Sequence, residues 1–232
     1  MPISVIILAG PLAPLGPKSV PSGIAKSPLA APVWLGPEGL DGDAQGDRSV
    51  HGGPEKALLH YAHDHYADWR AEIGDAPPLG RAGAFGENIS SAGLTESGVA
   101  IGDVFRLGGA RVQVSQMRQP CWKLNARFGV SDMARRVQTT GRTGWYYRVL
   151  EEGRVSPEDE LELLDRPAAD WTMARLQRVF YRDMMNRAEL EAMAALDVLP
   201  NNVRDRARKR LASGQVEDWA PRLWGEEAEP AP

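Results

Sequence analysis

The chain has 232 residues, of which 43% are hydrophobic and 25% are charged, and its formal net charge is −4. This size and composition are typical of one globular domain with a small appendage, and they exclude a disordered chain, a collagen and a coiled coil. The single cysteine, Cys121, excludes an internal disulfide, an iron–sulfur cluster and a cysteine-rich zinc site. The acidic balance gives no overall positive field that would favour nucleic acid.

The first apolar segment, Ile3–Ala9, is too short to span a bilayer. No Lys or Arg precedes Lys18, so the basic region of a signal peptide is missing. The segment therefore predicts a buried first strand, and we expect a cytoplasmic protein without a membrane partner.

Up to residue 166 the chain alternates short β-like runs with Gly, Pro, Asp and Asn, which predicts a mixed, mainly β barrel with interspersed helices. Gly108-Gly109 predicts a hairpin turn because paired glycines tolerate positive φ. The predicted strands are Ile3–Leu8, Ala30–Leu35, Gly98–Leu107, Ala110–Gln116, Gly144–Leu150 and Glu160–Leu164. The predicted helical stretches are His63–Ile73, Cys121–Arg127 and Ser131–Gln138.

After Arg166-Pro167 the pattern becomes helical, so we expect a second domain over 167–232 with three short helices and an acidic, Pro-rich tail over 226–232. Such short helices are marginal alone and must pack on each other or on the barrel. The predicted helices are Thr172–Tyr181, Arg187–Leu196 and Asn201–Ala212, with Asn186 and Asn201 as caps and an end at Ser213-Gly214.

Three motifs are too incomplete to predict a site. The Asp41–Asp47 segment resembles a calcium loop, but Gly52 stands where the last carboxylate ligand belongs. The histidines at 60, 63 and 65 have no carboxylate at a recognised zinc spacing. The basic cluster Arg204–Arg210 lacks aromatic residues, so we expect a solvated helix face, with docking of an acidic protein partner as the alternative.

Cys121 lies at the most informative junction of the chain. A predicted strand ends near Gln116, Pro120 precedes the cysteine and a helical stretch follows, so the helix N-terminus favours a thiolate. Arg118 and Lys123 add positive charge. We therefore expect a nucleophile or a soft-metal ligand, with an inert buried cysteine as the alternative.

Four segments rich in glycine and polar residues resemble the MOSC domain, named after the C-terminal region of molybdenum-cofactor sulfurases. They read SGIAKSPL, GLDGD followed by VHGGPEKAL, FGENIS followed by GLTE, and GDVFRLGGARVQVSQMRQPCWKL. The strings GRTGWYYRVL and LASGQVEDWAPRLWG resemble the bacterial 6-N-hydroxylaminopurine resistance branch, in which a three-helix domain follows the barrel. Met117-Arg118-Gln119-Pro120 departs from the proline or serine often found there, but Arg118, Pro120 and Cys121 remain.

The resemblance implies a molybdenum cofactor (molybdopterin) and the reduction of small N-hydroxylated compounds to amines, in which R–NHOH, two electrons and two protons give R–NH2 and water. Cys121 would be the catalytic residue and the protein ligand to molybdenum, a role that suits a soft thiolate. We expect no pyridoxal phosphate. The residues assigned to the cofactor are Ser22, Lys26, His51, Gly52, Gly53, Lys56, Glu87, Asn88, Arg118 and Lys123. A structural role in the loops is the alternative for each.

The sequence shows no means of collecting electrons from a nicotinamide, because it has no Gly-rich nucleotide loop and one cysteine. We therefore expect a separate reductase partner. Two alternatives stay open: a sulfur carrier with a Cys121 persulfide, and a non-enzymatic module that binds a cofactor or nucleic acid through its C-terminal helices. We expect no specific nucleic acid partner. A homodimer is one expected assembly.

Overall fold

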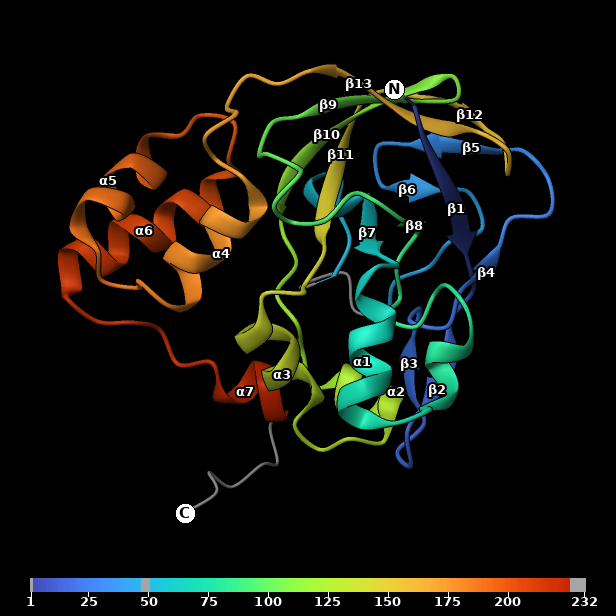
Figure 1. Cartoon of the computed structure of the whole chain (residues 1–232), viewed down its shortest axis with the longest axis horizontal. Helices are drawn as coiled ribbons and strands as arrows, with labels where there is room; N and C mark the ends of the chain where they lie inside the picture. Colours follow the sequence, from blue (N-terminus) through green and yellow to red (C-terminus); the bar gives the residue numbers. More distant parts are fainter. Residues whose placement is uncertain (1, 47–50, 226–232) are drawn as a thin grey trace.

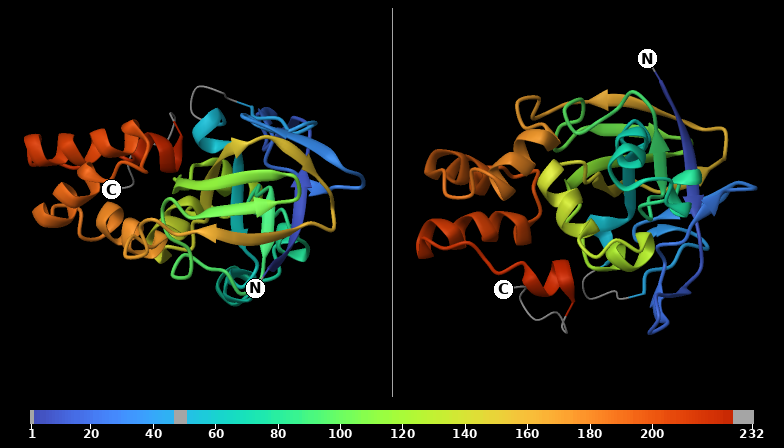
Figure 2. Two further views of the ribbon diagram at one scale, coloured as in Figure 1. Left: turned by 90° about the horizontal axis from the view of Figure 1, so that it is seen from above. Right: turned by 60° about the horizontal axis from the view of Figure 1, so that its bottom comes forward.

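The computed structural model describes residues 2–46 and 51–225, and the tail predicted at 226–232 lies outside these ranges. A barrel stands beside a smaller helical part, with helix α7 returning to the end of the barrel (Figures 1 and 2). Among the described residues, no helix is long and apolar enough to cross a membrane.

An eight-stranded sheet closes into the barrel because β1 pairs with both β8 and β13, which places β4 outside the ring. All neighbours in the ring are antiparallel except β7 and β8. The strands, in their order around the sheet, are β13 (Glu160–Asp165), β9 (Val104–Leu107), β10 (Ala110–Met117), β11 (Trp145–Glu151), β7 (Leu58–Ala62), β8 (Ile89–Ser91), β1 (Ile3–Ala9) and β4 (Ser27–Pro28). The predicted mainly β barrel is confirmed.

Two smaller sheets flank the barrel. The hairpin of β2 (Ala13–Leu15) and β3 (Val20–Ser22) is one of them. The other contains β5 (Val33–Gly36), β6 (Gly39–Leu40) and β12 (Gly153–Val155).

The Gly108-Gly109 hairpin is confirmed, since Leu107 pairs with Ala110 and Gly108 has φ 55°. The strand predicted over Gly98–Leu107 is too long, because the chain turns at Gly102 (φ 81°) and β9 begins only at Val104.

Helices and short 3-10 turns cover one end of the barrel. The predicted helical stretches appear as α1 (His65–Ile73), α2 (Lys123–Phe128) and α3 (Met133–Thr140). The turns are η1 (Pro54–Lys56) and η2 (Pro77–Gly80). Tyr61, Phe85 and Leu124 lie in the apolar cluster beneath them, which also includes Leu223 from the last helix. The C-terminal end of the described chain is therefore packed against the barrel end.

The helical part contains α4 (Met173–Tyr181), α5 (Arg187–Ala195) and α6 (Asn201–Ser213), and α7 (Ala220–Trp224) follows it without having been predicted. Asn186 caps α5 by accepting from the Glu189 N–H, as expected. The cap predicted at Asn201 is wrong, because Pro200 occupies that position and Asn201 is already helical. Gly214 ends α6 with φ 67°.

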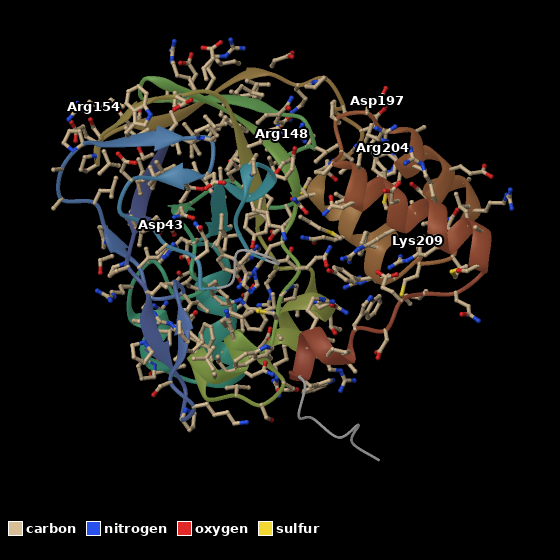
Figure 3. The ribbon with its side chains drawn as sticks, turned by 180° about the vertical axis from the view of Figure 1, so that it is seen from behind. Asp43, Arg148, Arg154, Asp197, Arg204 and Lys209 are labelled. Carbon is tan, nitrogen blue, oxygen red and sulfur yellow. The ribbon has the colours of Figure 1, made fainter. Side chains whose placement is uncertain are left out.

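The helices share one apolar core with the barrel, as their marginal length required. Met173 and Leu176 of α4 belong to the same buried cluster as Ile101 and Val114 of the barrel. Arg148 of β11 adds a polar link, donating to the Val198 carbonyl at 2.7 Å. Figure 3 shows it at the border of the two parts.

The expectation of a solvated basic helix face over Arg204–Arg210 holds for the exposed Arg208 and Lys209 and is wrong for Arg210. Arg210 is 1% exposed, pairs with Glu217 at 2.9 Å and donates to the Phe180 carbonyl. Arg206 lines a cavity facing the barrel. The basic residues of α6, of which Figure 3 labels two, thus point in several directions.

Candidate functional site

Cys121 lies in the loop that joins the end of β10 to α2. β10 ends at Met117, and the Arg118 N–H continues the pairing by donating to the Gly144 carbonyl at 3.1 Å. The partly exposed Cys121 thiol has its Sγ 3.9 Å from Nε2 of His51. The strand-to-helix junction that the sequence predicted is therefore present, with α2 only six residues long.

Arg222 of α7 holds the backbone on both sides of Cys121. Its guanidinium donates to the carbonyl of Pro120, and its own carbonyl accepts from the Trp122 N–H at 2.8 Å. A further bond to Gln138 Oε1 at 2.6 Å fixes the guanidinium. A residue from the C-terminal end of the chain therefore fixes the loop that presents the thiol.

Cys121 lines two adjoining cavities, an inner one of about 100 Å³ and an outer one of about 1170 Å³. His51, Lys56 and Lys123 also line both. Of the predicted cofactor residues, the inner cavity brings together Ser22, Lys26, His51, Gly52, Lys56, Asn88, Arg118 and Lys123. Gly53 and Glu87 do not line either cavity.

Arg118 brings an unsatisfied charge to the inner cavity. The side chain is 6% exposed, and its Nη2 donates to the Phe85 carbonyl at 3.1 Å. Its Nη1 is buried and has no hydrogen-bond partner among the described residues. A buried guanidinium in this state attracts an anionic ligand that can accept a hydrogen bond.

Lys26 and Asn88 are held by Asp43, which Figure 3 labels on the barrel side of the molecule. Lys26 and Asp43 form a buried ion pair, and burial lowers the pKa of Lys26. Asn88 donates to Asp43 at 2.9 Å and to the Leu8 carbonyl, and it accepts from the Leu59 N–H. These side chains form a rigid polar wall, and their hydrogen bonds are largely satisfied within the protein.

The turn that carries Lys56 depends on two glycines. Gly52 and Gly53 have φ of 86° and 83°, which side chains other than glycine rarely adopt. Ser115 and Gln116 of β10 both donate to the carbonyl of Glu55, at 2.7 and 3.1 Å, and so fix the turn to the barrel. Gly53 thus shapes the loop without lining the cavity.

Glu87 acts on the loop behind the cavity. It is fully buried and accepts from the N–H groups of Gly83 and Phe85, at 2.7 and 2.9 Å, and from the Tyr66 hydroxyl. The loop that it holds includes the Phe85 carbonyl that receives Arg118. The structure thus places Glu87 where it supports Arg118 from behind.

Several lining residues were not identified from the sequence. The outer cavity also includes Gln119, Trp122, Tyr146, Asn202, Arg206, Arg222 and Trp224. Lys18 lines it too. Most of these residues come from α6, α7 or the neighbouring strand, and no local motif marks them.

His60 serves the barrel core and not a zinc site. Its ring nitrogens lie 3.0 Å from the Tyr147 hydroxyl and 2.8 Å from Ser91 Oγ, and its ring contacts Trp145 at 4.3 Å. Burial lowers the pKa of His60 to about 3. The imidazole is therefore neutral in the folded protein at neutral pH.

This burial makes the protein sensitive to acid. Between pH 6.5 and about 3 the unfolded chain binds a proton at His60 that the folded chain does not, so stability falls as the pH falls. At pH 4.5 the loss from this group is about 2–3 kcal/mol. Urea unfolding at pH 7 and pH 4.5 should show a smaller loss in His60→Gln than in the unaltered protein. An equal loss in both would contradict this assignment.

The comparisons with known proteins agree with this geometry. Residues 47–162 match the MOSC domain model, and residues 171–214 match the YiiM-like, 3-alpha helix domain. The chain belongs to the MOSC domain family. It is 41% identical to Protein YiiM of Escherichia coli over 209 residues, which cover 90% of this chain and 93% of that protein.

A solved structure and one further relative extend the comparison. The crystal structure of YiiM from Escherichia coli superposes with a TM-score of 0.83 at 36% identity, covering 97% of this chain and all of that one. A protein of Gibberella moniliformis called Reductase is 38% identical over 197 residues, covering 84% of this chain and 34% of that protein. The three-helix arrangement that the sequence resemblance implied is therefore confirmed together with the family.

The described residues fit an anionic molybdenum cofactor of the kind that MOSC domains are associated with. Arg118 has an unused buried donor in the cavity, and Lys56 and Lys123 face the same space. Cys121 supplies a soft sulfur donor at the junction of the two cavities. Asp43 is the one carboxylate among the described lining residues, and it is engaged by Lys26.

Proposed function

We propose that this protein reduces N-hydroxylated bases and related compounds to amines in the cytoplasm with a bound molybdenum cofactor. The observation that carries the proposal is the buried, unpartnered Nη1 of Arg118 in a cavity that Cys121 also lines. Membership of the MOSC family and a fungal relative called Reductase support the reaction class.

Different residues of the site have different roles in the proposed reaction. Arg118, Lys56 and Lys123 bind the anionic cofactor, and Cys121 ligates molybdenum through its thiolate. When bound, this cofactor supplies the two electrons that convert R–NHOH, with two protons, to R–NH2 and water. His51, with Nε2 3.9 Å from the Cys121 sulfur, is the group that we assign to proton delivery.

The proposal requires a separate electron donor, because the chain has one cysteine and no Gly-rich nucleotide loop. Holo-protein with NADPH alone should leave an N-hydroxylated base unchanged, and adding a flavin reductase should start turnover. The measurement is amine formation by chromatography. Turnover with NADPH alone would overturn the requirement for a partner.

The decisive experiment measures molybdenum and pterin in protein made by a cofactor-competent host. The proposal predicts both in amounts approaching one per chain. The sulfur-carrier alternative predicts cyanolysable sulfur on Cys121 without metal. Protein with such sulfur and without molybdenum would replace the proposal by this alternative.

A further inference from the structure

The outer cavity is larger than a free base requires, although it must also admit the part of the cofactor that reaches Cys121, because the inner cavity is only about 100 Å³. The volume of the outer cavity is about 1170 Å³, whereas pockets for whole drug-sized ligands span roughly 300–1,000 Å³. One wall comes from the barrel and includes Cys121, and the other comes from the helical part and includes Asn202 and Arg206 of α6. A substrate that fills this space extends from the thiol towards α6.

Arg206 presents a positive charge to this space. Its Nη1 donates to Gln119 Oε1 at 2.8 Å, which holds the guanidinium against the Cys121 loop. Its only carboxylate contact among the described residues is Glu217 at 3.8 Å, and that carboxylate binds Arg210 at 2.9 Å. Arg206 is therefore anchored by a neutral group and is 38% exposed.

The charged side chains in the described lining of the outer cavity are all basic. This described lining contains five Lys or Arg side chains and no Asp or Glu. Burial lowers the pKa of Lys56, and the charge of Arg206 lowers it further, so the two cations repel each other across the same space. An anion bound between them is attracted by both.

The same cavity offers apolar surface to a planar group. Trp122 and Trp224 line it, and the backbone N–H of Trp122 donates to the Arg222 carbonyl. Planar bases stack on aromatic side chains of this kind. The cavity thus combines an aromatic surface near the thiol with a cation on α6.

We propose that the outer cavity binds a phosphate-bearing substrate, with Arg206 as its phosphate ligand and Lys18 as a further cation. This inference rests on the proposed function, and it makes the substrate an N-hydroxylated nucleotide in preference to the free base. The base lies towards Cys121 and the phosphate lies towards α6. Arg206 is then a specificity-determining residue of the helical part.

The test compares 6-N-hydroxylaminopurine with its ribonucleoside 5′-monophosphate as substrates of the holoenzyme and its reductase. The unaltered enzyme should show the higher kcat/KM for the nucleotide. In Arg206→Gln the ratio of nucleotide to base kcat/KM should fall about 10- to 100-fold, through KM, because a hydrogen bond to a charged group is lost. Arg206→Lys should restore part of the ratio, since it keeps the charge.

Arg208→Gln is the matched control, because Arg208 lies on the same helix, pairs with Asp205 and does not line the cavity. Its ratio should equal that of the unaltered enzyme. Equal ratios in all variants, or an equal fall in Arg208→Gln, would overturn the phosphate subsite. The cofactor also carries a phosphate, so the molybdenum and pterin content of Arg206→Gln is measured as well. A loss of pterin in this variant would assign Arg206 to the cofactor and overturn the inference.

A failure of the proposed function is distinguishable from a failure of this inference. If neither substrate is reduced, the reductase proposal fails, and calorimetric titration of the same proteins with adenosine monophosphate decides the subsite. Binding that Arg206→Gln weakens at least about tenfold, and that Arg208→Gln retains, supports the subsite. No binding, or equal binding in both variants, overturns it.

Discussion

Cys121→Ser should abolish reduction of N-hydroxylated bases, with a fall in kcat on the order of 10³-fold or more. A serine hydroxyl is a hard, weakly acidic donor and does not replace a soft thiolate at molybdenum. The bound molybdenum should be lost or altered, while the protein stays folded because Cys121 is partly exposed and outside both apolar clusters.

The measurements are steady-state amine formation, metal content and thermal unfolding of the purified variant. Because the chain has one cysteine, alkylation of the unaltered apo-protein modifies the same atom and gives a second, mutation-free version of the experiment. Activity and molybdenum content close to those of the unaltered protein would disprove the role of Cys121. Normal metal content with loss of cyanolysable sulfur alone would favour the sulfur-carrier alternative.

The hairpin at Gly108-Gly109, the strand before Cys121 and the three C-terminal helices were predictable because each is encoded by neighbouring residues. Strand β7 was missed because all five of its side chains are buried, so its sequence has no alternation of apolar and polar residues. The short β8 was missed for a related reason, since two of its three buried residues are serines.

The candidate site was likewise predictable only where neighbouring residues in the sequence define it. Resemblance to a family pointed to Cys121, Arg118 and the glycine loop at 52–53, and the cavity contains most of these residues. Arg222 and Arg206 come from about 100 and 85 residues further along the chain. Their positions in the site depend on how α6 and α7 pack beside the barrel, and no motif or spacing in the sequence predicts that packing.

Arg118→Met should remove most of the bound cofactor while leaving the apo-protein folded. The unused Nη1 is worth roughly 10- to 100-fold in affinity for an anionic ligand, because hydrogen bonds to charged groups contribute about 1.5–3 kcal/mol. Molybdenum and pterin content per chain is the measurement. Arg118→Lys should retain more cofactor than Arg118→Met, because it keeps a positive charge in the cavity.

Stability separates a binding role from a structural one. In the apo-protein, the buried Arg118 guanidinium has no acidic partner among the described residues, so replacing it removes a desolvation penalty, whereas the Phe85 carbonyl loses its donor. These effects oppose each other, so the free energy of unfolding should change by no more than about 1 kcal/mol. Arg136→Met on α3, where the partly exposed Arg136 pairs with Asp132, is the control that should keep both cofactor and stability.

The two readouts together decide the role of Arg118. If Arg118 has a structural role, its replacement lowers the free energy of unfolding, and cofactor is lost because less native protein is present. A side chain kept for binding leaves the apo-protein as stable as before and lowers only its cofactor content, as is usual where a site carries an unsatisfied group. If Arg118→Met lowers the free energy of unfolding of the apo-protein by several kcal/mol, or if the variant retains full cofactor, the inner cavity is not an anion site.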